Sequence, residues 1–549
     1  MSIEQTDDTS SGGAADTPET IHYYLTTAID YPNGAPHIGH ALEKAVADIV
    51  VRYHRLLGHD THFSMGIDEN SLHVLTAANE HGVKPQQWVE TLDIAFRQAW
   101  EKLNISYDYW IRTTTEAHKR ASQEMFRRAQ ASGDIYKSTY SGWYCPNCNT
   151  FYTSEELIGG RCPNHPSLSP EWLHEENYFF ALSRYGERLQ AHIEEHPDFI
   201  VPASRKAEVL GLLRQGLRDF SVSRLVRPGT EDWGIPVPGD PQHVIYVWFD
   251  ALTNYLTSVG FPDDTTRFET YWPANAHVIG KDITRFHCLY WPAMLFSAGL
   301  PLPRQIPVHG FFTLEGRRIS KTLGNVIDPV GLVDKVGADA VRFYMARNLS
   351  FASDGDFSRL GLIRHYNEEL GNDLGNLLNR VVSMIKRYRQ GIVPIVTAST
   401  TPSPSSPSSP SSTYNEELRN LARDVRTQTA AALDSWEIGG ALNTVWSLVR
   451  RTNQYIEQSE PWHLAKDPAQ SQALDTVLYS AAEATRISAI LLSPFIPTSS
   501  DRIMAQLGLP PVHAGAWEHE AVWGGVALHN VVPGPLLFPR LDPELATTL

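Results

Sequence analysis

The stretch His22–His40 reads HYYLTTAIDYPNGAPHIGH and contains the strongest local fold signal in this chain. The residues up to Ile29 are rich in β-branched and aromatic side chains, which is typical of a strand. A Pro/Asn/Gly turn follows, and apolar residues then recur at helical spacing as far as Gly58. The sequence therefore predicts a strand-to-helix turn that carries two histidines, His37 and His40.

A turn of this kind suits an anion. The backbone N–H groups at the start of the helix and the helix dipole favour negative charge, and an imidazole donates a further hydrogen bond to a phosphate. Gly39 has no Cβ, which lets a flat ring such as adenine lie close to the backbone. A surface turn with solvated histidines gives the same short motif, so this segment alone leaves both interpretations open.

A second polar segment, Arg318-Ile319-Ser320-Lys321-Thr322, lies far downstream. It follows an apolar run, Val308–Phe312, that predicts a strand, and it precedes a helical pattern at Pro329–Arg347. Glycines on both sides of Ser320 and Lys321 indicate a loop that presents a point charge on a flexible stem to a phosphate. An ordinary basic surface loop is the alternative for an isolated cluster of this composition.

Together the two segments resemble the paired signatures of the class I aminoacyl-tRNA synthetases. His37–His40 matches the HIGH signature, and Arg318–Thr322 matches KMSKS with Arg and Ile in its first two positions. The resemblance implies a Rossmann-type α/β catalytic domain that uses ATP with Mg²⁺, in which His37, His40 and Lys321 are catalytic. It implies a set of nucleotide-binding residues made up of Gly39, Lys281, Asp282, Arg318, Ser320 and Lys321.

Four further segments are similar to methionyl-tRNA synthetases: Thr26–Asn33, Tyr246–Tyr255, His277–Asp282 and Trp291–Ala293. This likeness runs from about Ile21 to the C-terminus. It implies ATP-dependent ligation of L-methionine to tRNA(Met) through a methionyl-adenylate. The implied methionine-binding residues are Ile29, Tyr31, Asp68, Arg224, Trp248, Ala251, Tyr255 and His287, with Asp68 on the amino group and Arg224 supporting it. A thioether is bound by shape and sulfur–aromatic contacts, although plain core packing uses the same aromatic residue types.

The chain departs from that family around Asp68. Gly66-Ile67-Asp68-Glu69-Asn70-Ser71 stands where many members carry Thr-Asp-Glu-His-Gly. This difference leaves open a paralogue with altered amino-acid or acceptor specificity. A synthetase for isoleucine, leucine or valine is disfavoured, because the insertion between the two signatures is too short for the larger editing domain expected in those enzymes.

Cys145, Cys148, Cys162 and His165 form a candidate metal site between the two signatures. The pattern is Cys-x2-Cys, a gap of thirteen residues, and Cys-x2-His, which suits tetrahedral zinc. A disulfide or free thiols are the alternatives, but three of the four cysteines of the chain fall within this short window. No nearby residue suggests an activated water, so we expect the Zn²⁺ to be structural.

The chain of 549 residues predicts several structural units. The expected order is an acidic disordered tail at 1–20, the first half of the catalytic domain at 21–133, a zinc-bearing inserted domain at 134–233, the second half with the KMSKS-like loop at 234–356, and an α-helical anticodon-binding domain at 357–549 that contains a disordered Ser/Pro loop at 397–413.

The formal net charge of −16 indicates that any RNA partner meets a local basic face rather than the whole surface. By resemblance, the anticodon of tRNA(Met) is read by Asn376, Arg380 and Trp462; solvated helix faces are the alternative. The sequence has no apolar run of about 18 residues and no basic or apolar leader at its start. It ends at Leu549 without an appended dimerisation domain, so we expect a cytoplasmic monomer without membrane partners.

Overall fold

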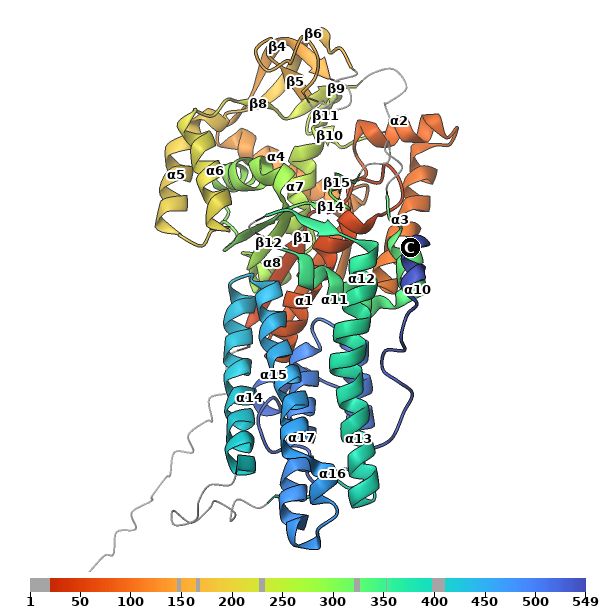
Figure 1. Ribbon diagram of the computed structural model, residues 1–549. Helices are drawn as coiled ribbons and strands as arrows, with labels where there is room; N and C mark the ends of the chain where they lie inside the picture. The colour runs from red at the N-terminus through yellow and green to blue at the C-terminus, as the bar shows by residue number, and fades with distance from the viewer. Residues whose placement is uncertain are drawn as a thin grey trace, which may run out of the picture.

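The computed structural model describes residues 20–145, 150–163, 168–226, 233–319, 326–351, 353–396 and 410–549. An α/β body occupies the centre of the molecule, an antiparallel β cap lies above it, and a bundle of long helices extends below (Figure 1). The predicted tail at residues 1–19 and residues 397–409 of the predicted Ser/Pro loop lie outside the described residues.

The α/β body is built on a six-stranded sheet in which every described pair of neighbours is parallel. In spatial order its strands are β3 (Tyr109–Arg112), β2 (Asp60–Ile67), β1 (His22–Thr27), β12 (Ala276–Gly280), β13 (Ile306–His309) and β7 (Ile200–Val201). The two predicted halves of the sheet meet where β1 pairs with β12, with Leu25 opposite Ala276. The sheet also recruits an edge strand, β7, from the stretch predicted as an insertion, because Ile200 is buried beside Ile306.

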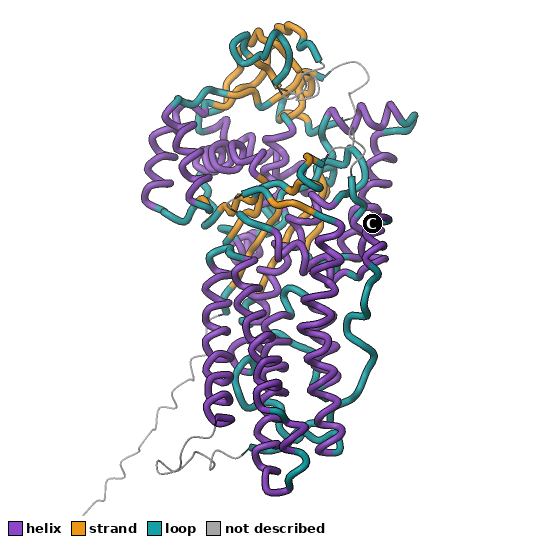
Figure 2. Tube along the Cα trace, in the orientation of Figure 1, coloured by secondary structure: helices purple, strands orange, loops and turns teal. Residues whose placement is uncertain are grey.

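Helices cover both faces of this sheet, and the strands are accordingly buried and apolar (Figure 2). One core lies against the bundle and the other lies under the cap. The helices of the α/β body are α1 (Ile38–Leu56), α2 (Leu72–Glu80), α3 (Pro85–Lys102), α4 (Glu116–Ala131), α7 (Val247–Thr257), α8 (Thr265–Tyr271), α9 (Trp291–Ser297), α10 (Pro329–Val336) and α11 (Ala338–Asn348). The single helical pattern predicted over Pro329–Arg347 is therefore two helices, broken at Gly337, whose φ of 86° favours glycine.

The cap is made from two antiparallel sheets and two helices. Its elements are β4 (Ile135–Cys145), β5 (Thr150–Tyr152), β6 (Glu171–Phe180), β8 (Phe220–Ser221), β9 (Ser223–Leu225), β10 (Pro236–Val237), β11 (Asp240–Ile245), α5 (Gly186–Glu195) and α6 (Ala203–Arg214). A further small sheet, β14 (Phe312–Leu314), β15 (Arg317–Arg318) and β16 (Gly355–Phe357), follows β13 and leads into the second signature.

The bundle begins after α12 (Arg359–His365), where a π-helical segment, Tyr366–Gly375, continues into α13 (Asn376–Arg389). The remaining helices are α14 (Pro410–Asp434), α15 (Ile438–Ser459), α16 (Pro461–Leu464), α17 (Ser471–Leu492), α18 (Pro497–Gln506) and α19 (Ala516–His519). Residues 410–413 were predicted as loop but belong to α14, since proline is well tolerated in the first turn of a helix. None of the helices in the described ranges has both the length and the apolar character that crossing a membrane requires.

Arg342 on α11 connects the α/β body to the bundle. Its side chain and that of Asp48 on α1 are both fully buried, with 2.7 Å between Nη2 and Oδ2. The same guanidinium donates to the backbone carbonyls of Pro494 and Phe495 in the bundle. Burial alone would raise the pKa of Asp48. The guanidinium groups of Arg342 and Arg52 nevertheless hold this pKa at about 2.

Replacing Arg342 with Met should lower the free energy of unfolding by about 3–5 kcal/mol, because it leaves the Asp48 carboxylate buried with one fewer cation. Urea unfolding followed by circular dichroism measures the change. Arg120→Met is the matched control: it removes a solvent-exposed pair with Asp263 and should barely move the midpoint. Equal shifts for the two variants would contradict the connecting role of Arg342.

Candidate functional site

The strand-to-helix turn predicted from the first signature is present, and its histidines cap α1. His37 is the N-cap residue, and its Nδ1 accepts a hydrogen bond from the Gly39 N–H at 3.1 Å. His40 Nδ1 accepts from the His37 N–H, also at 3.1 Å, and the two rings stack 3.8 Å apart. Because each Nδ1 acts as an acceptor, the neutral tautomer carries its proton on Nε2, which becomes the donor atom of each ring.

Gly39 is needed for a reason that the sequence did not suggest. A Cβ at this position would lie 3.0 Å from His37 Cε1 and 3.1 Å from Nδ1. A side chain at this position would therefore crowd the His37 ring that accepts from the Gly39 amide. The glycine keeps the capping arrangement intact as well as leaving the backbone open.

A cavity of about 1120 Å³ opens beside this turn. Its walls come from the ends of β1, β2, β12 and β13 and from α1 and α7, at the carboxyl edge of the parallel sheet where ligands bind in open α/β folds. The predicted residues that line it are Ile29, Tyr31, His37, Gly39, His40, Asp68, Trp248, Ala251, Tyr255, Asp282 and His287. Ile319, the last described residue before Ser320, lines it too. The described end of the second signature and the first signature therefore border the same cavity.

One end of the cavity is aromatic. Trp248 stacks on Phe286 with ring centroids 3.7 Å apart, and Tyr31 meets Trp248 edge-on at 6.2 Å. The Tyr255 hydroxyl donates to His287 Nε2 at 2.6 Å, while His287 Nδ1 donates to the Ile283 carbonyl at 3.1 Å. Burial lowers the pKa of His287 to about 4, so its ring stays neutral and adds no positive charge to this end of the cavity.

Asp68 brings a carboxylate into this aromatic end. It lines the cavity, is 2% exposed, and its Oδ1 has no hydrogen-bond partner among the described residues. Burial, followed by the charge of Glu69, raises the pKa of Asp68 well above the ordinary carboxyl value. Glu69 itself is held by Arg112, whose Nη2 lies 2.6 Å from its Oε1. A buried acceptor of this kind suits a cationic ligand group.

The unusual residues after Asp68 have local partners. The Asn70 side-chain amide donates to Asp250 Oδ2 at 3.0 Å and to the Thr113 carbonyl at 3.1 Å. Ser71 caps α2 by accepting from the Val74 N–H. The departure from the family pattern therefore leaves Asp68 at the cavity wall and gives Asp250 a hydrogen-bond donor.

Further polar groups in the cavity wall were not selected from the sequence. Glu43 Oε2 lies 3.2 Å from His309 Nε2, and Glu43 Oε1 lies 2.7 Å from the buried Lys44 ammonium. Asn254 Oδ1 and Asp30 Oδ2 are buried acceptors without partners among the described residues. Glu43 was detectable as the side chain one helical turn beyond His40, since residues three apart share a helix face. Asn254 and His309 lie inside segments that the sequence analysis quoted.

Lys281 and Arg224 lie outside the described lining of this cavity. Lys281 Nζ is 2.7 Å from both carboxylate oxygens of Asp354, which does line it, and sits over the Phe311 ring. Arg224 Nη1 donates to Ser221 Oγ and to the Ser223 carbonyl. The Arg318 side chain, Ser320 and Lys321 lie outside the described residues, so their predicted nucleotide contacts stay predictions.

The zinc pattern is only partly described. Cys145, at the end of β4, and Cys162 are both buried, with 0% and 1% exposure. Cys148 and His165 lie outside the described residues. Within the described ranges no group of three or more potential ligands gathers, and the metal site stays a prediction.

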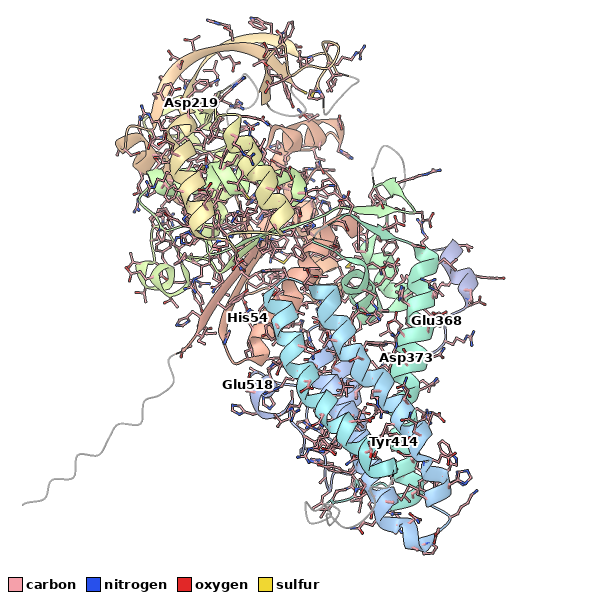
Figure 3. All side chains as sticks on the ribbon, turned by 60° about the vertical axis from the view of Figure 1, so that its left-hand side comes forward. His54, Asp219, Glu368, Asp373, Tyr414 and Glu518 are labelled. Carbon is pink, nitrogen blue, oxygen red and sulfur yellow. The ribbon has the colours of Figure 1, made fainter. Side chains whose placement is uncertain are left out.

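The predicted anticodon residues lie on the bundle. Asn376 is exposed at the start of α13, and Arg380 one turn later pairs with Glu457 of α15 at 2.7 Å. Trp462 follows on α16 and is partly buried against the core. The preceding π-helical segment is anchored to α15, because Asp373, labelled in Figure 3, accepts from Trp446 and Arg450. The contact between α13 and α15 thus holds Arg380 near the turn that carries Trp462.

Comparison with known families shows which proteins this chain is similar to. The family described as "tRNA synthetases class I (M)" matches residues 23–168 and 166–382, and the "Anticodon binding domain of methionyl tRNA ligase" matches residues 407–534. A methionine–tRNA ligase of Caldanaerobacter subterraneus is 42% identical over 95% of this chain and 79% of its own length. One from a Nostoc species is 43% identical over 88% and 90%.

Solved structures agree with the sequence relatives. A Mycobacterium tuberculosis methionyl-tRNA synthetase in complex with methionyl-adenylate is 39% identical, covers 95% of this chain and 100% of its own, and superposes with a TM-score of 0.87. The free form of that enzyme is 37% identical over 96% and 99%, with a TM-score of 0.82. The chain belongs to the methionyl branch of the class I tRNA synthetases.

Proposed function

We propose that this chain joins L-methionine to ATP, releases pyrophosphate, and transfers the methionyl group from the adenylate to tRNA(Met). One observation carries this proposal: the first signature, the described end of the second, and an aromatic pocket with a buried carboxylate line a single cavity. The cavity lies at the carboxyl edge of the sheet, and the comparisons favour methionine as the amino acid.

At the polar end of the cavity, the histidines of α1 are assigned to the phosphates. With Nδ1 of each ring accepting a backbone N–H, the Nε2–H groups of His37 and His40 are the donors for the α-phosphate and the leaving pyrophosphate. Lys321 is proposed to add positive charge from the second signature. Mg²⁺ enters with the nucleotide and neutralises part of its charge. Gly39, Asp282, Lys281, Arg318 and Ser320 are proposed to complete the ATP site.

At the aromatic end, Tyr31, Trp248 and His287 are proposed to surround the thioether, together with Ile29, Ala251 and Tyr255. The neutral His287 and the stacked rings supply a polarizable, uncharged wall for sulfur. Asp68 is proposed to hold the ammonium of the substrate, and Arg224 to support this end from outside the cavity lining.

Asp68→Ala should raise the methionine concentration needed for pyrophosphate exchange by about two orders of magnitude, because truncating one partner of a buried charge pair costs several kcal/mol. ATP binding should stay near normal. Asp263→Ala, at an exposed carboxylate outside the cavity lining, is the control. Equal loss of methionine and ATP binding would show that Asp68 is structural instead.

We infer that the cap holds a structural Zn²⁺ through Cys145, Cys148, Cys162 and His165. The donor set fits, because three thiolates and one imidazole at this spacing suit tetrahedral zinc. Both described cysteines are almost fully buried: Cys145 ends β4, and Cys162 lies in the connection between β5 and β6. When bound, the ion would supply cross-links that stabilise the cap rather than chemistry for the reaction.

Cys145→Ser should reduce the zinc content of the purified chain to near zero and weaken aminoacyl transfer more than it weakens the α/β body. Elemental analysis, run beside transfer assays, measures both effects. Cys288→Ser, at a buried cysteine outside the pattern, should keep its zinc. Wild-type protein free of zinc would rule out the site.

For the RNA, we propose that Trp462 stacks on an unpaired anticodon base, with Asn376 and Arg380 donating hydrogen bonds beside it. The Arg380–Glu457 pair is solvent-accessible, at 30% and 61% exposure, so an RNA group competes for Arg380 at low cost. The monomeric state and the cytoplasmic location stay predictions, and a paralogue with altered amino-acid or acceptor specificity stays the alternative.

Trp462→Ala should reduce charging of tRNA(Met) about tenfold or more, since base stacking is worth roughly 1–3 kcal/mol. Methionine-dependent pyrophosphate exchange should not change. Trp462→Phe keeps a ring face and should recover most of the charging. Loss of both activities in the Ala variant would instead point to a packing role in the bundle.

A further inference from the structure

The second signature begins at Arg318, the last residue of a short β-hairpin beside the cavity. The hairpin consists of β14 and β15, and the described strands share two residue pairs, one from Thr313 and one from Leu314. The turn between them is formed by Glu315 and Gly316, whose φ angles of 50° and 76° are both positive, as a type I′ turn requires. A hairpin of this length is marginally stable alone, so its position depends on neighbouring segments.

The third strand of this small sheet, β16, supports the hairpin. It runs parallel to β14, with Asp356 opposite Thr313. The next residue, Phe357, is fully buried in the core and meets the Tyr344 ring of α11 edge-on, with ring centroids 5.1 Å apart. The Glu315 N–H donates to the Phe357 carbonyl at 3.0 Å. The hairpin is therefore built on a strand that is itself anchored in the core of the α/β body.

Asp356 is the residue of β16 whose side chain reaches the turn. Its Oδ1 accepts a hydrogen bond from the Gly316 N–H at 2.8 Å and another from the Thr313 hydroxyl at 2.5 Å. A single oxygen atom thus joins the turn of the hairpin to its first strand. Both donors are neutral, so the contact requires an acceptor at this place rather than a negative charge.

The same segment reaches the cavity. Asp354, two residues before Asp356, lines the cavity together with Phe311 and Thr313. Its carboxylate accepts from the Phe311 N–H at 2.9 Å and lies 2.7 Å from the ammonium of Lys281, which is one of the residues proposed for the ATP site. The segment Asp354–Asp356 therefore connects the wall of the cavity to the hairpin that leads into the second signature.

We propose that Asp356 is a positioning residue for the nucleotide step, because it fixes the turn of the hairpin that delivers the second signature to the cavity. The inference rests on the proposed function, since it assumes that the second signature acts on the phosphates of ATP. Its physical basis is preorganisation: a hairpin that is held in place before ATP binds does not have to be ordered during the reaction. Asp356 lies outside the described lining of the cavity, whereas Ile319, directly after the hairpin, lies within it.

Asp356→Ala should lower kcat/KM for ATP about tenfold in methionine-dependent pyrophosphate exchange, because it removes two hydrogen bonds. Methionine affinity, measured by calorimetric titration of the full chain without ATP, should not change, because the residues proposed to bind methionine lie on other elements. Asp334→Ala, which removes an exposed pair with Lys102, is the matched control and should keep both values. Normal kcat/KM for ATP in Asp356→Ala, or an equal loss of methionine affinity, would overturn the proposal.

Asp356→Asn separates the two hydrogen bonds from the charge of the carboxylate. The amide oxygen of asparagine can accept from the same two neutral donors, so this variant should recover most of the activity that Asp356→Ala loses. A residue that acted through its negative charge would give equal losses in the two variants. Equal losses would therefore overturn the positioning role.

A second variant disturbs the turn without touching Asp356. Gly316→Ala places its Cβ in open space, so the change acts through the positive φ, which residues other than glycine adopt at a cost. This cost should lower kcat/KM for ATP about fivefold, again with methionine affinity kept. Hydrogen exchange of the peptide that covers the hairpin, followed by mass spectrometry, should be faster in Gly316→Ala and Asp356→Ala than in wild type or Asp356→Asn. Unchanged exchange in both faster variants would show that Asp356 does not hold the turn.

The outcomes separate the inference from the proposed function. Methionine-dependent pyrophosphate exchange by the wild type, together with an unaffected Asp356→Ala variant, overturns the inference and leaves methionine activation standing. Wild-type protein that exchanges no pyrophosphate with methionine overturns the proposed function, and the assignment of Asp356 to the nucleotide step falls with it.

Discussion

The buried Asp48–Arg342 pair is the constraint on which the arrangement of this molecule depends. Asp48 belongs to the helix that starts at the HIGH-like turn, and Arg342 belongs to a helix that follows the second signature. A fully buried guanidinium must satisfy all its donors. Arg342 does so through Asp48, the Pro494 and Phe495 carbonyls of the bundle, and the Leu103 and Asn104 carbonyls of the α/β body. The pair therefore ties α1, α11 and the bundle into one relative position.

This position sets the geometry between the cavity and the bundle. The α1 turn presents His37 and His40 to the cavity, while the bundle carries Trp462 at a distance from it (Figure 1). A rigid connection fixes the distance between the cavity and the helix turn for which anticodon reading is proposed. The scaffold behind the cavity is densely packed on both sides of the sheet.

The cavity wall shows how a neutral and a charged region coexist within one site. Burial keeps His287 neutral, and its Nε2 accepts a hydrogen bond from Tyr255, whereas Asp68 is a buried carboxyl without a cation among the described residues. The Glu43–Lys44 pair balances charge within the protein, whereas Asp68 lines the cavity with its Oδ1 unpartnered among the described residues. Similar carboxyl groups thus have different roles because their partners differ.

The sequence by itself determined the elements and chemistry that depend on near neighbours. The strand, turn and helix around His37 are local, because β-branched runs, turn residues and helical spacing act over a few residues. Most of the residues predicted for the site do line the cavity. The sequence could indicate them because they lie in segments similar to the family. The spacing of the zinc ligands is local as well. Two of these ligands, Cys148 and His165, lie outside the described residues, so the metal site stays a prediction.

Only the tertiary structure decided the features that depend on contacts between distant segments. Ile200 joins the main sheet from within the cap, the Asn70 side chain reaches Asp250 on α7, and Arg342 reaches both Asp48 and the bundle. Burial without a partner, as at Asp68 Oδ1, is likewise invisible in a sequence. The physical reason is that desolvation and pairing depend on all surrounding chain segments, whereas helical and strand periodicity depend only on the segment itself.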